Sequence, residues 1–475
     1  MIQGRKAGIY RAACAALCFP IGAGALIAQT TKPLLPDAPP SRLIAAANKQ
    51  QSTPAPQPDA HPAPTSQHPR LTRVEAEQMA IRNNPQVSVG RLLALAQHQV
   101  VRETRAAELP TFSASITAMD AEDATRISAG SLTASRLFEH AGAGGGVTQL
   151  ITDFGRTRNL VASSKLQEDA QNAHALATTE DIVLATDQAF YNALQAQSLL
   201  KVATQNVETR QTTDTLVSQL TKNKLKSTLD LSFADVNLSQ AKLLLLDAQN
   251  NADSSMAALD TVLGLDRQVT YDLVDTNAPV QPPPPDAEQL IQLGLRQRPD
   301  LQALNYGAQA AVKFSHAQHD QMLPTISAAG TAGSVPIRPA QYYVANWWGA
   351  VGVNMNIPIF NGFLYSAQAK EASIRAQAAS EQRRDLQDQI VRDIRTSWLA
   401  ANTAFQRVSV TAELLNQANL ALKLAETRYQ LGLSSIVELS QAQYQQTDAA
   451  IANTNAQYQY RLALATLNYQ IGAAP

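Results

Sequence analysis

Apolar residues recur at three- and four-residue steps along two long stretches of the chain. In the second stretch the series is Ile374, Ala378, Leu386, Ile390 and Ile394, followed by Trp398, Ala401 and Phe405. This spacing places the apolar side chains on one face of a helix. Because neither stretch contains a proline, the sequence predicts two helices of about 65 residues, each about 100 Å long at 1.5 Å per residue.

Each long helix is expected to turn back on itself as an antiparallel hairpin. At the second turn, Gly432 enters a left-handed conformation at no steric cost and therefore reads as a helix C-cap. Ser435 and Glu438 have the spacing of a capping box that opens the next helix. At the first turn Lys224 stands at the place of the glycine, and residues 227–230 open a helix that reaches about 263–264.

Short segments with a two-residue period lie before the long helices. Residues 111–118 alternate polar and apolar, and residues 325–328 repeat the same phase. Residues 347–357 alternate again, which predicts strands of about 111–120, 143–152, 325–333 and 347–357. The segment around 142–147 alternates poorly because it is rich in glycine.

The chain carries a tandem duplication. Leu109-Pro110 recurs as Leu323-Pro324, and Leu231-Ser232 recurs as Leu439-Ser440. A strand-to-helix turn is expected at Asp153-Phe154-Gly155, and we match it to Phe360-Asn361-Gly362. Since such matches in register are rare by chance, we expect repeats over 70–264 and 286–472, joined by a linker at 265–285.

The N-terminal segment, 1–28, is typical of a secretory signal peptide. Basic residues precede a short apolar run that contains Cys14 and Cys18, the two cysteines of the chain. Acylation of Cys18 is an alternative, but Leu17 stands where lipid attachment needs a small residue. The proline-rich residues 29–69 predict a disordered linker.

No later segment has eighteen consecutive apolar residues, so no transmembrane helix is expected after the signal peptide. A membrane-embedded part would then have to be a closed β-barrel. Four strands cannot close a barrel alone, so several protomers would share one. The formal net charge of −1 argues against a nucleic-acid partner.

The duplication, the two Leu-Pro pairs, the strand-to-helix turns and the segment Tyr429–Glu438 resemble the TolC-like outer-membrane efflux proteins. The resemblance implies a mostly α-helical homotrimer in which four strands per protomer form a twelve-stranded β-barrel, continued by an α-helical barrel through the periplasm. It implies a periplasmic adaptor, an inner-membrane pump of RND, MFS or ABC type, and contact with outer-membrane lipid. It implies no enzymatic activity and no cofactor.

The resemblance also assigns candidate site residues. Glu438, Gln441 and Tyr429 would form the gate; Gln441 replaces a second acidic residue of relatives, which leaves at most one acidic ring. The adaptor-docking tips would comprise Lys222, Lys224, Leu225, Lys226, Leu431, Gly432, Leu433 and Ser434, the last in place of an arginine of relatives. Tyr342, Tyr343, Trp347 and Trp348 would be interfacial aromatics. Tyr429 can also be ordinary packing between helices.

Three functions fit this pattern. The first is the exit duct of a tripartite efflux system, and the second is a type I protein-secretion duct with the same architecture. The third is a non-conducting coiled-coil protein of the cell surface, which four strands of outer-membrane type disfavour. His316 and His319 are one helical turn apart, but such a pair is more often a polar helix face than a metal site.

Overall fold

The computed structural model describes residues 69–119, 126–127, 135–136, 140–267, 269, 271–275, 281–337 and 347–473. These residues all lie in one compact unit, Ser66–Pro475. The predicted signal peptide, the predicted linker apart from Pro69, and the aromatic residues Tyr342 and Tyr343 lie outside the described residues.

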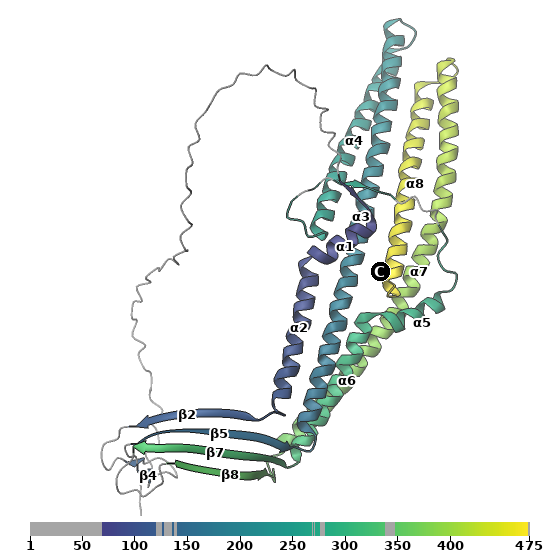
Figure 1. Ribbon diagram of the computed structural model, residues 1–475. Helices are drawn as coiled ribbons and strands as arrows, with labels where there is room; N and C mark the ends of the chain where they lie inside the picture. The colour runs from purple at the N-terminus through teal and green to yellow at the C-terminus, as the bar shows by residue number, and fades with distance from the viewer. Residues whose placement is uncertain are drawn as a thin grey trace, which may run out of the picture. The chain divides into compact units, whose positions relative to one another are not determined.

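Two helical hairpins dominate the unit (Figure 1). The helices α3 (Arg156–Lys222) and α7 (Leu364–Gln430) have 67 residues each, and α4 (Thr228–Val262) and α8 (Ile436–Gln470) have 35 each. The same offset in numbering relates α3 to α7 and α4 to α8, so the two hairpins correspond residue by residue. Among the described residues, no helix combines the length and apolar character needed to cross a membrane.

Four shorter helices extend the framework. They are α1 (Arg73–Asn83), α2 (Pro85–Ala106), α5 (Ala287–Gln297) and α6 (Pro299–His319), the last followed by the 3-10 turn η2 (Asp320–Met322). Proline occupies the first position of α2 and of α6, where a missing amide hydrogen costs nothing.

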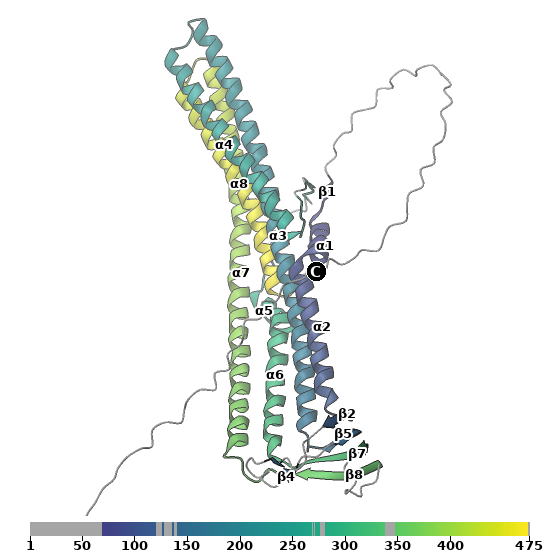
Figure 2. The ribbon, with the colours of Figure 1, turned by 90° about the vertical axis from the view of Figure 1, so that its left-hand side faces the viewer.

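The helices pack as two side-by-side rows that share α3 and α7. On the tip side the row is α4, α3, α8 and α7, and on the sheet side it is α2, α3, α6 and α7 (Figure 2). Alanine is the commonest buried residue along these contacts, which lets helix backbones approach closely. Larger side chains form separate clusters where α1, α3 and α4 meet, where α5 to α8 meet, and at the tips.

One antiparallel sheet carries two β-hairpins in the order β2, β5, β7 and β8. Its strands are β2 (Thr111–Met119), β5 (His140–Thr152), β7 (Thr325–Ile337) and β8 (Trp347–Asn356). Two small pairings add to it: β1 (Arg70–Leu71) lies parallel to β6 (Asp272–Leu273), and β3 (Arg126–Ile127) pairs with β4 (Ser135–Arg136).

The glycine-rich segment belongs to β5, which begins earlier than the alternation predicts. A Cβ at Gly142 would lie 2.8 Å from the carbonyl oxygen of Ser334, and one at Gly333 would lie 2.9 Å from the Trp348 ring. Glycine therefore permits close approach of neighbouring strands and of a covering aromatic ring. Because these glycines have no side chains, the segment lacks the alternation of polar and apolar residues from which a strand is predicted.

The two strand-to-helix turns each use two successive residues with positive φ. These are Phe154 (54°) and Gly155 (114°) before α3, and Gly362 (64°) and Phe363 (67°) before α7. The structural partner of Gly155 is thus Phe363, because each directly precedes the first residue of its long helix. The sequence match of Gly155 with Gly362 was wrong by one position. The order of Phe and Gly is exchanged between the repeats, so matching by residue type misplaces the register.

Candidate functional site: the helical tips and the sheet faces

The turn between α7 and α8 confirms the predicted glycine cap. The amide of Leu433 donates to the carbonyl of Arg428 at 2.8 Å, and the amide of Gly432 donates to Tyr429 at 3.0 Å. Gly432 has a φ of 74°, the left-handed conformation that these two bonds require. The chain therefore reverses at the second tip within a few residues.

The turn between α3 and α4 has the same backbone with a lysine in the strained position. The amide of Leu225 donates to Leu220 at 2.9 Å, and that of Lys224 donates to Thr221 at 2.9 Å. Lys224 adopts a φ of 59°. A side chain in this conformation costs on the order of 1 kcal/mol, which Gly432 avoids.

The helices that leave the two tips are capped differently. Ser227 and Asp230 form a complete capping box, with the Asp230 amide 3.2 Å from the Ser227 hydroxyl and the Ser227 amide 3.3 Å from the Asp230 carboxylate. Ser435 accepts from the amide of Glu438 at 3.3 Å, but the return bond is not formed. The full capping box predicted there was wrong in this half.

The carboxylate of Glu438 is engaged elsewhere. Its Oε1 lies 3.2 Å from Nε of Arg428, in the last turn of the preceding helix, and each side chain is 47% exposed. The Glu438 carboxylate thus lies beside the guanidinium of Arg428 and not at the backbone amide of Ser435. The second tip is therefore closed by an ion pair between its two helices.

Tyr429 is buried between the two hairpins of one chain. It is 3% exposed and belongs to a cluster with Val217 and Ala234 of the first hairpin and Ile436 of the second. Lys226 of the first tip places Nζ 4.5 Å from the ring centroid. Among the described residues the Tyr429 hydroxyl has no hydrogen-bond partner. Burial, and secondarily the charge of Asp230, raises the pKa of Tyr429.

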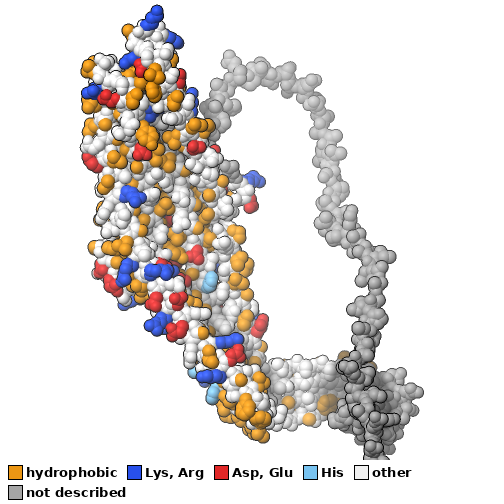
Figure 3. All heavy atoms as spheres, turned by 180° about the vertical axis from the view of Figure 1, so that it is seen from behind, with side chains coloured by type: hydrophobic (Ala, Val, Ile, Leu, Met, Phe, Trp, Pro, Cys, Tyr) orange, Lys and Arg blue, Asp and Glu red, His pale blue; other side chains and the backbone are white. Residues whose placement is uncertain are grey.

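The remaining predicted tip residues lie on the surface. Leu225, Leu431 and Leu433 are each about two-thirds exposed, and Lys222, Lys224 and Gln441 are exposed as well. Figure 3 shows basic side chains gathered at the extreme end of the molecule, where α3 meets α4. Lys226 and Ser434, equivalent positions of the two tips, are half-buried. The structure therefore offers leucines at both tips and lysines at the first.

The sheet has one apolar and one polar face. The register of the four strands places apolar side chains together on the first face, among them Phe112, Ile116, Val147, Val351 and Val353. It places Ser113, Ser115, Thr117, Thr331 and Asn354 on the opposite face. Phe112, Ile116 and Val351 are 79%, 87% and 91% exposed, so the apolar face has no cover within the described part of the chain.

Trp347 and Trp348 begin β8 on opposite faces of this sheet. Trp347 lies in phase with Val351 and is 76% exposed, whereas the Trp348 ring lies against Gly333 and Gly144. Of these two, Trp347 therefore points in the direction that an aromatic belt at a membrane interface needs.

A polar seam between α3 and α8 was not predicted from the sequence. Arg210 donates to Gln443 at 2.6 Å, Gln443 donates to Thr213 at 3.0 Å, and Thr447 donates to Asn206 at 3.1 Å. Arg210 is 7% exposed, and burial lowers its pKa. Sequence periodicity could not reveal the seam because α3 and α8 each contact more than one helix.

The sequence matches the outer membrane efflux protein family over residues 77–265 and 290–473. The chain belongs to this family. It is 25% identical to outer membrane protein TolC of Escherichia coli strain K12 over 354 residues, which cover 68% of this chain and 69% of TolC. The predicted resemblance, the mostly helical fold with a small β part, and an outer-membrane location are thereby confirmed.

Solved structures of similar fold include the CmeC outer membrane channel of Campylobacter jejuni, with a TM-score of 0.74, 17% identity, and coverage of 85% of this chain and 86% of CmeC. The open state of the MtrE outer membrane channel of Neisseria gonorrhoeae matches with a TM-score of 0.72, 19% identity, and coverage of 85% and 89%. At 17% and 19% identity, the similarity to these two structures establishes that this chain shares their fold, and no more than the fold.

Proposed function

We propose that the protein is the exit duct of a tripartite efflux system, a homotrimer that passively conducts substrates across the outer membrane. The observation that carries the proposal is the sheet with one uncovered apolar face, joined directly to helices of 67 residues. An apolar face suits contact with lipid, and a polar face suits a water-filled lumen. Helices of about 100 Å suit a conduit through the periplasm.

Three copies complete both parts of the duct. The strands β2 and β8 are the edges of a four-stranded sheet, and exposed edges invite pairing with another chain. Three sheets joined edge to edge give twelve strands, enough to close a barrel. The outer helices of the rows carry exposed leucines and valines, among them Leu92 and Leu95 on α2 and Val410 and Leu420 on α7.

The surface of the helical tips indicates the protein partners of the duct. The exposed Leu225, Leu431 and Leu433, with Lys222 and Lys224 at the first tip, form a surface for a periplasmic adaptor. Lysines favour an acidic segment of that adaptor. The adaptor in turn would link the duct to an energised pump in the inner membrane.

The gate lies at the second tip in this proposal. Threefold symmetry would bring three copies of Glu438 together at the narrow end, with Gln441 about one helical turn further on. Tyr429 would not line the pore. It would support the gate indirectly, because its ring packs the second tip against the first within each protomer. Gln441 carries no charge, so the carboxylate ring is single.

Reconstitution into planar lipid bilayers tests the duct. We expect stepwise increases of ionic conductance from the purified full-length protein, and a cation preference under a salt gradient. Protein denatured before addition provides the control. Insertion without conductance would instead support a non-conducting coiled-coil protein, and contradict the proposal.

A further inference from the structure

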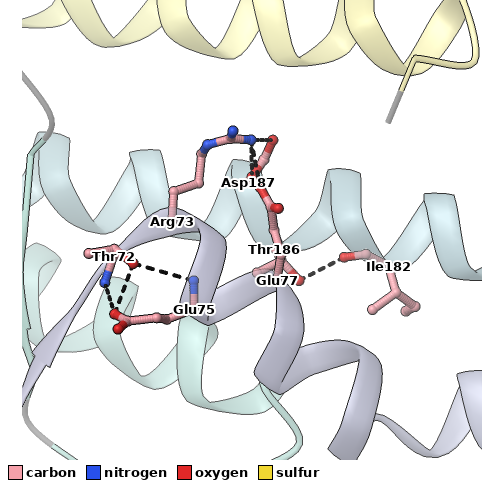
Figure 4. A network of polar contacts seen from close by, with 7 residues as sticks. All are labelled: Thr72, Arg73, Glu75, Glu77, Ile182, Thr186 and Asp187. Carbon is pink, nitrogen blue, oxygen red and sulfur yellow. Dashed lines mark hydrogen bonds and ion pairs between the residues drawn. The ribbon is translucent and has the colours of Figure 1, made fainter. Parts of the chain in front are cut away.

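Two buried carboxylates share one arginine where α1 packs against α3 (Figure 4). Nη1 of Arg73 lies 2.5 Å from Oε1 of Glu77 and 3.0 Å from Oδ2 of Asp187. Glu77 is 3% exposed and Asp187 is 6% exposed. Glu75 of the same helix turns away to the N-terminus, where it accepts from Thr72 at 2.9 Å.

The charges around this cluster do not supply a second cation. Tyr191 of α3 lies near the cluster: burial raises its pKa, and the charges of Arg73 and Asp187 also act on that pKa, in opposite directions. Arg461 of α8 is already paired with Asp275, which follows β6. From α4, Asp260 faces the backbone amide of Val269. Among the described residues, the cation within ion-pair distance of Glu77 or Asp187 is therefore Arg73 alone.

One arginine cannot balance two carboxylates in a buried site. Two like charges in contact disfavour double ionisation, and a shared proton relieves the repulsion. Burial raises the pKa of Glu77 from the ordinary value of 4.5 to about 7, and a hydrogen bond with Asp187 and the charge of Asp187 add to the rise. Glu77 therefore keeps its proton, next to the carboxyl group of Asp187, under mildly acidic conditions.

The cluster sits beside a shared hydrophobic core. Ala76 and Ala80 of α1 are fully buried in a cluster with Phe190 of α3, Leu259 of α4 and Tyr458 of α8. The helix α1 thus packs on α3 and contributes to a core cluster that also contains side chains of α4 and α8. Loosening α1 would uncover apolar surface of this cluster.

We propose that Arg73, Glu77 and Asp187 form a proton-dependent clamp: with one shared proton they hold α1 against α3, and without it mutual repulsion loosens α1. The proton occupies the contact between the two carboxyl groups, while Arg73 neutralises the remaining negative charge. This clamp belongs to the fold of the chain and operates whether or not the duct conducts.

The sign of the effect follows from the direction of the shift. The folded protein binds the Glu77 proton more tightly than the unfolded chain, so the clamp is complete below about pH 4.5 and weakens as pH rises through about 7. Over that window one proton is released on opening. The equilibrium constant for local opening of α1 then rises by about tenfold per pH unit, and levels off above pH 7.

Hydrogen exchange of the α1 amides in the purified full-length protein measures this constant between pH 5 and pH 9, after correction for intrinsic exchange. We expect the rise in the wild type and its loss in Glu77→Gln, because glutamine keeps the shape and the donor of the protonated carboxyl. The matched control is Glu103→Gln, which removes an exposed carboxylate from α2 and keeps the wild-type profile. Asp187→Asn is expected to move the midpoint to lower pH, because Glu77 then keeps Arg73 without a repelling neighbour.

Four results would overturn the clamp. One is a flat wild-type profile, and another is a Glu77→Gln profile that keeps the wild-type slope. The third is a Glu77→Gln protein whose α1 exchanges freely even at pH 5, since that would show that an ionised Glu77 is what holds the helix. The fourth is an unchanged midpoint in Asp187→Asn, since that would show that repulsion between the two carboxyl groups does not cause the pH dependence.

Discussion

At the residue scale, Lys224 and Gly432 occupy the same backbone conformation with very different side chains. Their positive φ values and their cap hydrogen bonds correspond between the two repeats. Selection for stability alone would favour glycine at both places. The lysine therefore places a charge at the first tip in spite of the backbone strain it causes.

Replacing Lys224 by glycine separates these two effects. We expect Lys224→Gly to raise the free energy of unfolding by up to about 1 kcal/mol, because the left-handed position loses its side-chain penalty. The reverse change, Gly432→Lys, should lower it by a similar amount. Chemical denaturation of the purified protein measures both. Equal stability of Lys224→Gly and wild type would show that the turn tolerates lysine without strain.

Arg428 bears on the proposed gate through its ion pair with Glu438. At 3.2 Å the guanidinium offsets the negative charge of the carboxylate, and both groups are accessible to ions. We expect Glu438→Gln to reduce the cation preference of the channel and Arg428→Gln to increase it. Reversal potentials under a potassium chloride gradient measure the two shifts.

The controls separate the effect of the proposed Glu438 carboxylate ring from the effect of the positive charge of Arg428. Asp253→Asn on α4 removes an exposed carboxylate away from the tip and should leave the reversal potential unchanged. If neither Glu438→Gln nor Arg428→Gln changes selectivity, Glu438 does not line the pore. If only Glu438→Gln does, the carboxylate lines the pore but Arg428 does not offset it. High salt should shrink both effects, since exposed charges are screened.

At the element scale, the sequence predicted every long helix and all four long strands of the sheet. Proline and glycine marked the ends, and periodicity supplied the rest, as at Leu109-Pro110 and Gly432. Two failures have a common cause. Phe363 takes a left-handed conformation without being glycine, and β5 is rich in glycines without alternation. In both places the residue type does not determine the backbone conformation. Neither residue propensity nor the hydrophobic pattern can therefore predict that conformation from the sequence.

The candidate site was predicted in part for a similar reason. Capping is local, so Gly432, Ser227 and Ser435 could be assigned to their turns from spacing alone. The Arg428–Glu438 pair joins two different helices, and the seam from Arg210 to Gln443 joins two different hairpins. Such partners depend on how the helices pack. A buried arginine held by neutral amides has no sequence pattern.

At the scale of the whole molecule, the exposed apolar surface is arranged along the edges of the helix rows. On α2 the buried side faces α3 through Val87, Gly90 and Ala94, while Leu92 and Leu95 point outward with 64% and 63% exposure. Leucines at that spacing on a free helix face are typical of a surface that a partner covers. The outer edge of α7 carries exposed leucines as well. The two edges therefore suit contact between neighbouring protomers.

Charged substitutions on the α2 edge test this assembly. Leu92→Asp together with Leu95→Asp should shift the protein from trimer to monomer, because each leucine contributes about 1.5–3 kcal/mol on burial and an unpaired buried carboxylate adds a further cost. Light scattering coupled to size-exclusion chromatography in detergent gives the mass of the assembly. Gln86→Asp places the same charge on an exposed position of α2 that lies at least about 120° around the helix from both leucines, and it should leave the trimer intact. A double variant that remains as trimeric as wild type would place this edge outside the interface between protomers, so the sheet edges and α7 would have to close the assembly without α2.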